Sequence, residues 1–360
     1  MRLNHLHLAR PVAYAYAGRL QNILYLEHEQ YRASLKSLSS NIHEPAPTLL
    51  TFETEPTYTV GRRRYSSFEV PEARISYLTS DSSEDYHPRH APKLAAWHTS
   101  DRGGLITYHG PGQLTAYLVL NLRRHGLGAR QYVELLEQIV IGTCQEHGVP
   151  NVATTADTGV WVTEQAEDAD TNKQQVTDRK VCAIGVRITS SVTRDGLALN
   201  IDDKPIDLPK TRKLLYTLPK DNMYLASSQN PTTSETEQQL YVPAPGFLSW
   251  GFGRIVACGL EGKRATWLTA EQDRNGTRNQ QAGSAILSAV ADTMAVKFAD
   301  ALKGVHGVDR ADENEILSRQ RMSWKEMRSL EGSLQDHRQC DVATMWSNRN
   351  IRDDSGIRFS

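Results

Sequence analysis

The chain has 360 residues, which is long enough for one large domain or two small ones around a sizeable core. Its 41 Lys and Arg against 42 Asp and Glu leave a net charge of -1, which argues against both a basic nucleic-acid binder and an acidic tail protein. The longest apolar runs are broken by polar residues, so the sequence predicts a soluble protein without a membrane span. The cysteines have no paired or regular spacing, which indicates free thiols in a reducing compartment rather than a zinc site or a disulfide framework; they are Cys144, Cys182, Cys258 and Cys340.

The amino terminus has two interpretations. Residues 1–21 carry three arginines, and no acid precedes Glu27, a composition that suits a mitochondrial transit peptide. Residues 12–20 also fit the beginning of the first folded element. A presequence that is short, or that overlaps the first element, is consistent with both patterns, and no cleavage site is indicated.

Two regular elements and an arginine triplet follow. Apolar residues at helical spacing predict an amphipathic helix over 17–38. Alternating β-branched and aromatic residues predict one strand over 48–60, which ends at Gly61. Arg62, Arg63 and Arg64 come next; alone they suggest a solvated loop, and the alternative is a contact with an anion or an acidic partner.

The most informative stretch is 102–113, which reads RGGLITYHGPGQ, after an irregular loop predicted over 77–94. A short β segment lies between two tight loops, and its strand is predicted to continue over 114–122. Gly103 and Gly104 can adopt positive φ and let a ligand approach the backbone, while Pro111 fixes the second turn. The stretch could be an ordinary β-turn-β element, or it could gather polar side chains around a ligand.

The remaining elements alternate between apolar strands and helices. A helix is predicted over 128–147, and strands are predicted over 159–163, 181–188 and 196–201, the second interrupted by Gly185. Residues 164–178 are polar. The segment 202–245 is poor in apolar residues and suggests a solvated excursion. An apolar strand then ends near residue 257, an Ala-rich helix follows over 283–302, and the polar remainder suggests a loosely attached tail.

Two residues suggest nucleophilic chemistry. Cys258 stands where an apolar strand stops and Gly259 follows, so its thiol could face a pocket beside a backbone N–H, although a free cysteine is more often a small core residue. Lys180 begins its own apolar strand and could act as a base or as a cation beside a thiolate; an exposed lysine at a strand end is the commoner case. Cys182, two residues beyond Lys180, would share its side of the strand and is the rival nucleophile.

The motifs RGGLITYHGPGQ, GVWV, RKVCAIGV, DGLALN and VACGL occur in this order, and in this the chain resembles the lipoyl(octanoyl) transferase family. The resemblance runs with interruptions from about residue 8 to about residue 302. It implies an α+β fold of mixed β-sheets flanked by helices, resembling the biotin/lipoate-protein ligase catalytic domain. The expected domains are 1–304 for catalysis, with the insertion at about 202–245, and 305–360 for the polar tail.

The resemblance also implies the reaction and the site. Members take an octanoyl group from acyl carrier protein and transfer it to a lysine of lipoyl domains, in 2-oxoacid dehydrogenase E2 subunits and the glycine cleavage H protein. Cys258 would be the thioester nucleophile, and Lys180 would lower its pKa and act as general base. No metal or other cofactor, nucleic acid or membrane is implied, and the expected location is the mitochondrial matrix. The acyl group would lie against Arg102, Gly103, Gly104, Leu105, Ile106, Thr107, Tyr108, His109, Ala183, Ile184, Gly185, Gly196, Leu197 and Ala198.

The chain departs from the family pattern at three points. Asp195-Gly196 stands where the family usually has His-Gly, which replaces a possible hydrogen-bond donor with an acid. Ala257-Cys258-Gly259 stands where Pro-Cys-Gly is usual. The interval of 78 residues from Lys180 to Cys258 is wider than usual because of the insertion, which costs little if it lies on the surface, since loop-closure entropy grows slowly with length.

Two other functions stay open at this stage. The first is an ATP-dependent lipoate or biotin ligase on the same fold, although such a ligase needs no thiol nucleophile and would have a Gly-rich nucleotide loop with a lysine. The second is a non-catalytic relative that binds acyl carrier protein or lipoyl domains. The presence of both Lys180 and Cys258 argues against the second.

Overall fold

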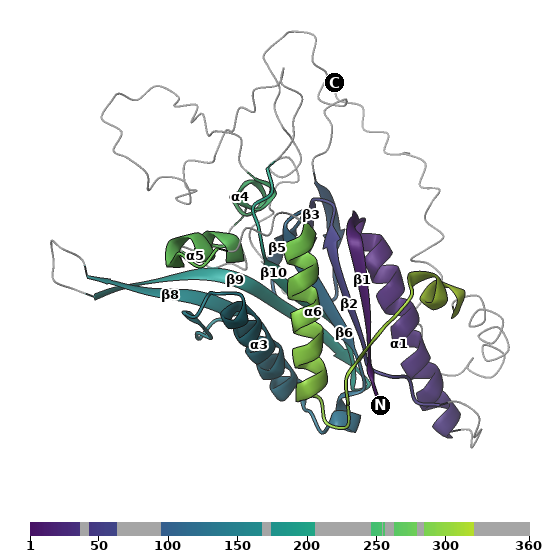
Figure 1. The fold of residues 1–360 in the computed structure, drawn as a ribbon. Helices are drawn as coiled ribbons and strands as arrows, with labels where there is room; N and C mark the ends of the chain where they lie inside the picture. Colours follow the sequence, from purple (N-terminus) through teal and green to yellow (C-terminus); the bar gives the residue numbers. More distant parts are fainter. Residues whose placement is uncertain are drawn as a thin grey trace, which may run out of the picture. The chain divides into compact units, whose positions relative to one another are not determined.

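The computed structural model describes residues 1–36, 43–62, 95–167, 174–205, 246–253, 255, 263–278 and 284–319. In these residues a large mixed sheet combines parallel and antiparallel strands, as Figure 1 shows, and helices cover both of its faces, so the predicted α+β class is confirmed. The strands in spatial order are β12 (Val308–Arg310), β1 (Leu3–Val12), β2 (Thr48–Thr54), β6 (Gln113–Val119), β10 (Val192–Asn200), β9 (Gln174–Thr189), β8 (Val160–Glu167) and β7 (Val152–Ala153), with β11 (Arg264–Ala265) paired to β9.

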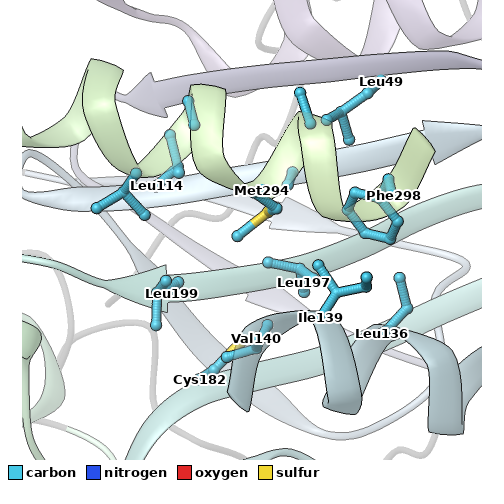
Figure 2. Packing of buried hydrophobic residues seen from close by; sticks show 14 of the residues in the cluster. Leu49, Leu114, Leu136, Ile139, Val140, Cys182, Leu197, Leu199, Met294 and Phe298 are labelled. Carbon is cyan, nitrogen blue, oxygen red and sulfur yellow. The ribbon is translucent and has the colours of Figure 1, made fainter. Parts of the chain in front are cut away.

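Two long helices cover one face of this sheet. Helices α3 (Ala129–Glu146) and α6 (Ser284–Ala301) contact each other and the sheet, and their apolar stripes bury leucine, valine and phenylalanine side chains from both layers. Figure 2 shows this packing, with Leu197 and Cys182 among the labelled side chains between the strands and the helices. We call this side of the sheet the core face.

Helix α1 (Tyr14–Lys36) contacts β2, β6 and β10. A second, smaller sheet has the order β4 (Ala96–Thr99), β3 (Thr57–Val60), β5 (Ile106–His109). Helix α4 (Phe247–Phe252) packs on β5, where Tyr58, Tyr108 and Trp250 form a separate apolar cluster. The other short elements are η2 (Leu122–His125) and α5 (Leu268–Asn275). No described helix is long and apolar enough to cross a membrane.

The three helices predicted from periodicity are present to within three residues at each end, as α1, α3 and α6. The single strand predicted over 48–60 is instead two strands, because the chain turns at Glu55-Pro56 and β3 joins the small sheet. The short β segment predicted before the turn at Gly110-Pro111-Gly112 and its continuation predicted over 114–122 are β5 and β6, which lie in different sheets. Each turn moves the chain from one sheet to the other.

The amino-terminal residues 3–12 form β1, which pairs with both β2 and β12, and a transit peptide in this region stays a prediction. The strands predicted over 159–163 and 181–188 are both longer than predicted. The polar stretch after residue 163 continues β8 and β9 as a ribbon in which Glu164–Glu167 pair with Gln174–Thr177. Gly185 does not interrupt β9.

The compact unit runs from Met1 to Ile316, so β12 belongs to it although the predicted domain ended at residue 304. Several predictions lie outside the described residues. They are the loop 77–94, most of the insertion, Arg63 and Arg64, the end of the strand before Cys258, Cys258 itself, and the tail beyond 319.

Candidate active site

A β-bulge in β9 decides which way Lys180 faces. Trp161 of β8 lies opposite Lys180, whereas its neighbour Val160 lies opposite Cys182, so Val181 is an extra residue without a partner on β8. Residues directly opposite each other share a face, and consecutive residues alternate. Trp161 and Val160 therefore point to opposite faces, and so do Lys180 and Cys182.

This corrects the prediction that Cys182 shares the side of Lys180. Cys182 is fully buried on the core face, where its thiol donates to the Ala183 carbonyl oxygen at 3.5 Å. Burial raises the pKa of Cys182 well above its ordinary value and the pKa of Cys144 to about 12. Neither thiol is suited to be a nucleophile.

Beyond the bulge, Ala183 and Gly185 share the face of Lys180, which we call the site face. Gly185 pairs with Gly196 and Ala183 with Ala198, so two segments predicted to bind the acyl group are direct neighbours. Thr115 of β6 extends the second row beside Ala198. Small side chains therefore line this part of the site face, where Ala198 and Thr115 are buried.

Two of the predicted acyl-binding residues face the other way. Leu197 belongs to the buried core with α3 and α6, and Ile184 packs against the same cluster. The two residues are opposite each other across β9 and β10. Only their backbone can take part in a site on the opposite face.

Arg102 is the anchor of the glycine loop. Its Nη2 donates to the Thr59 carbonyl and Oγ1, both at 2.8 Å, and to the Leu105 carbonyl at 2.9 Å, while its Nη1 donates to the Gly103 carbonyl at 2.9 Å. Five N–H donors in a planar group allow this many bonds from one residue. The side chain is buried, and its bonds to Thr59 attach the glycine loop to β3.

The glycines let this loop lie directly on the sheet. The Gly103 N–H donates to the Val186 carbonyl at 3.1 Å, and a Cβ on Gly185 would be 3.0 Å from the Gly103 carbonyl oxygen. Gly104 has φ of 89°, in the left-handed region that favours glycine. A Cβ on Gly61 would be 2.3 Å from the Gly104 carbonyl oxygen. The RGG loop is thus brought against β9 beside the Gly185–Gly196 pair.

Strand β5 divides its side chains between two environments. Ile106 and Tyr108 enter the apolar cluster with Trp250, and the Tyr108 ring fills the space where a side chain on Gly251 would stand. His109 faces the other way and stacks on Tyr14, with ring centroids 5.7 Å apart. Burial raises the pKa of Tyr108 far above its ordinary value, so this phenol is no acid.

A buried hydrogen-bond chain fixes the tautomer of His109. Gln113 Nε2 donates to the Tyr108 carbonyl at 3.2 Å and to Asn200 Oδ1 at 2.9 Å, so its Oε1 accepts from His109 Nδ1 at 2.7 Å. The amide orientations follow because the chain ends on carbonyls that only accept, those of Tyr108 and Thr266. Burial lowers the pKa of His109 to about 4, so the ring is neutral and its buried Nε2 presents a lone pair with no partner among the described residues.

The same chain continues to the backbone of Lys180. Asn200 Nδ2 donates to the Thr266 carbonyl at 2.9 Å, and the Thr266 N–H donates to the Lys180 carbonyl at 2.9 Å. The Thr266 hydroxyl donates to Glu271, which is ion-paired with Arg179. Sequence analysis missed Asn200, Thr266 and Trp161 as site residues, although two of them lie within the motifs GLALN and GVWV.

The Lys180 amine lies beside an aromatic ring. Its Nζ is 4.6 Å from the centroid of the buried Trp161 ring, and no ion pair joins it to a carboxylate of the described residues. A Cβ on Gly159 would be 2.8 Å from Lys180 Cε. Lys180 is therefore partly buried against the Trp161 ring, and its amine has no carboxylate partner among the described residues.

Cys258 lies outside the described residues, but residues on either side of it do not. Ile255 belongs to the apolar cluster with Tyr108 and Trp250. Ala265, seven residues after Cys258, pairs directly with Lys180. The pairing of β11 with β9 thus returns the chain to Lys180 seven residues after Cys258.

Asp195, at the position where the resembling family usually has histidine, has φ of 58° and is 9% exposed. Burial raises the pKa of this carboxyl to about 6, and the guanidinium groups of Arg194, Arg102 and Arg187 oppose the rise. Its protonated form can donate a hydrogen bond as a histidine can. No group of three His, Cys, Asp or Glu residues in the described part of the chain could hold a metal ion.

The lipoyl protein ligase A/B catalytic domain matches residues 28–223, a span that includes Arg102 and Lys180 and ends before Cys258. A probable octanoyltransferase of Schizosaccharomyces pombe is 35% identical over 193 residues, 53% of this chain and 70% of that protein. The mitochondrial octanoyltransferase of Arabidopsis thaliana is 36% identical over 186 residues, 51% of this chain and 66% of that one. The mitochondrial octanoyl-acyl-carrier-protein:protein N-octanoyltransferase of Danio rerio is 31% identical over 260 residues, 72% and 81% of the two chains.

Proposed function

This chain belongs to the lipoyl protein ligase A/B catalytic domain family and is an octanoyltransferase, and we propose that it works through a thioester on Cys258. The octanoyl donor would be octanoyl-acyl carrier protein, as the name of the Danio rerio relative states for that protein. The acceptor would be a lysine of lipoyl domains, in 2-oxoacid dehydrogenase E2 subunits and the glycine cleavage H protein.

The proposed cycle uses Lys180 for both proton transfers. The Cys258 thiolate, paired with the Lys180 ammonium, attacks the thioester carbonyl, and the carbon–sulfur bond to the carrier breaks. The departing carrier thiolate takes a proton from Lys180, which leaves a neutral amine. The acceptor lysine then attacks the acyl-enzyme and gives its proton to Lys180, while the Cys258 thiolate leaves. Charge and protons balance at the end of each turnover.

The observation that carries this proposal is the bulge at Val181, which presents Lys180 on the same face as the Gly185–Gly196 and Ala183–Ala198 pairs. An alkyl chain can lie on a surface of small side chains, and burying about eight carbons there is favourable at roughly 0.8 kcal/mol per methylene. The Arg102–Gly104 loop lies beside the same glycines. A base and a set of small residues thus share one face.

The names of the relatives support a location. The Arabidopsis thaliana and Danio rerio proteins are mitochondrial, and a mitochondrial location is the best supported for this chain. We assign it to the matrix as part of the proposal. The donor needs no activation by ATP because it is already a thioester, so no nucleotide is required.

The test is intact-mass analysis of the protein mixed with octanoyl-acyl carrier protein, with Cys258→Ser and Cys182→Ser beside it. A thiol-sensitive octanoyl adduct that disappears only in Cys258→Ser supports the proposal. An adduct on Cys258→Ser would refute the assignment of the nucleophile. Carrier binding without any adduct would favour the non-catalytic relative, and octanoylation of a lipoyl domain that needs ATP would favour the ligase.

A further inference from the structure

Two lysines share the ring of Trp161. The Nζ atoms of Lys180 and Lys263 lie 4.6 and 4.5 Å from the ring centroid, within the range of a cation–π interaction. The two ammonium groups differ in their ionic partners. Lys263 is neutralised, since its Nζ is 2.7 Å from Asp157 Oδ2 and 3.6 Å from Asp178 Oδ2. Lys180 has no such partner among the described residues.

Asp157 also fixes the Trp161 ring. Trp161 is fully buried, and its Nε1 donates to the Asp157 carbonyl at 2.9 Å. Asp157 therefore holds the edge of the indole through its backbone and Lys263 through its carboxylate. This leaves the indole little freedom to turn away from Lys180.

Gly159 also lies close to the amine. A Cβ there would be 2.8 Å from Lys180 Cε and 3.3 Å from Nζ, and φ of 120° is itself unfavourable for other residues. The Lys180 amine thus lies close to both Gly159 and the Trp161 ring. The motif TGVW at 158–161 supplies both the space and the ring.

We propose that Trp161 is a positioning residue, which holds the Lys180 ammonium by its π face and leaves its charge available to the Cys258 thiolate. A carboxylate in the place of the ring would hold the amine as well, but it would compete with the thiolate for the positive charge and repel it. An uncharged aromatic ring does neither. The inference rests on the proposed function, because that function assigns Cys258 and Lys180 their roles.

The experiment measures the thiol pKa of Cys258 directly. Iodoacetamide alkylation of Cys258, followed by peptide mass spectrometry across a pH series, reports the thiolate fraction without octanoyl carrier. Lys180→Met is expected to raise the pKa of Cys258 by roughly one unit or more, since an opposite charge within about 4–6 Å shifts a pKa by this amount. Trp161→Leu is expected to raise it by part of that shift, and to add nothing in the Lys180→Met background.

Two further variants keep the outcome interpretable. Trp161→Phe retains a ring and is expected to give a smaller shift in the same direction, which also serves if Trp161→Leu does not fold. Phe298→Leu removes a buried aromatic ring from the core face and is expected to leave the pKa unchanged. An unshifted pKa in both Trp161 variants, with a raised pKa in Lys180→Met, would overturn the inference. No shift in Lys180→Met would instead refute the thiol–lysine pair of the proposed function.

Discussion

Replacing Arg102 should destabilise the fold more than any exposed arginine does. Arg102→Met keeps the aliphatic stem that lies near Gly185 but removes every bond from Nη1 and Nη2. The carbonyls of Thr59, Gly103 and Leu105 each lose this donor, and the Leu105 carbonyl keeps only the Gly61 N–H at 3.2 Å. A buried acceptor without a partner costs about 1–3 kcal/mol. We expect the free energy of unfolding to fall by about 3–5 kcal/mol. Arg102→Lys should recover only a part, because a single ammonium cannot reach all three carbonyls.

Urea unfolding followed by circular dichroism measures the change. Arg130→Met is the matched control, since Arg130 is 92% exposed and bonds only Glu134 on its own helix among the described residues. Its effect should stay within about 0.5 kcal/mol. A loss below about 1 kcal/mol in Arg102→Met would refute the reasoning, because it would mean that water replaces the guanidinium at these carbonyls.

Three other predictions concern the sheet, acid stability and the carrier. Gly196→Ala should cost about 1–3 kcal/mol in thermal unfolding, since its Cβ would be 2.2 Å from the Ala116 carbonyl oxygen; an unchanged melting temperature would contradict this. Burial lowers the pKa of His5 and His28 to about 4, so below the unfolded value of 6.5 the unfolded chain binds more protons. Stability should therefore fall between pH 6.5 and 4, by up to about 1.4 kcal/mol per unit for each, and His5→Gln should flatten the slope. Reversing the charges of Arg62–Arg64 should weaken binding of acyl carrier protein at low salt, and an unchanged affinity would argue against docking there.

Periodicity predicted the long helices because each buries one continuous apolar stripe. Helix α3 places Tyr132, Leu136, Ile139 and Val140 in the core, a 3.6-residue pattern that no strand would use. The ends of β8 and β9 gave no comparable signal. There Glu164–Glu167 pair with Gln174–Thr177, and both segments are mostly polar in sequence, without a regular apolar alternation. A sequence without that alternation gives no strand signal.

The order of the motifs predicted which segments meet but not how they face. The RGG loop, RKVCAIG and GLALN do come together, at Gly103, Gly185 and Gly196. Strict alternation along β9 would have turned Lys180 toward the core with Cys182. A single inserted residue reverses this, and the side chains of Lys180, Val181 and Cys182 contain nothing that announces a bulge. Orientation depended on the register with β8, which only tertiary structure supplies.

The long interval between Lys180 and Cys258 has a simple structural consequence. Strand β11 pairs in parallel with β9 at Lys180 itself, and Thr266 ties that pairing to Asn200, so the chain after the interval is attached to the site by its own hydrogen bonds. The insertion also departs from the sheet next to its return point, because Pro205 bridges to Gly246. Closure of a loop whose ends are already adjacent costs only about 0.6 kcal/mol for each doubling of its length. We therefore expect the stability of this region to depend on the attachment at Lys180 more than on the length of the insertion.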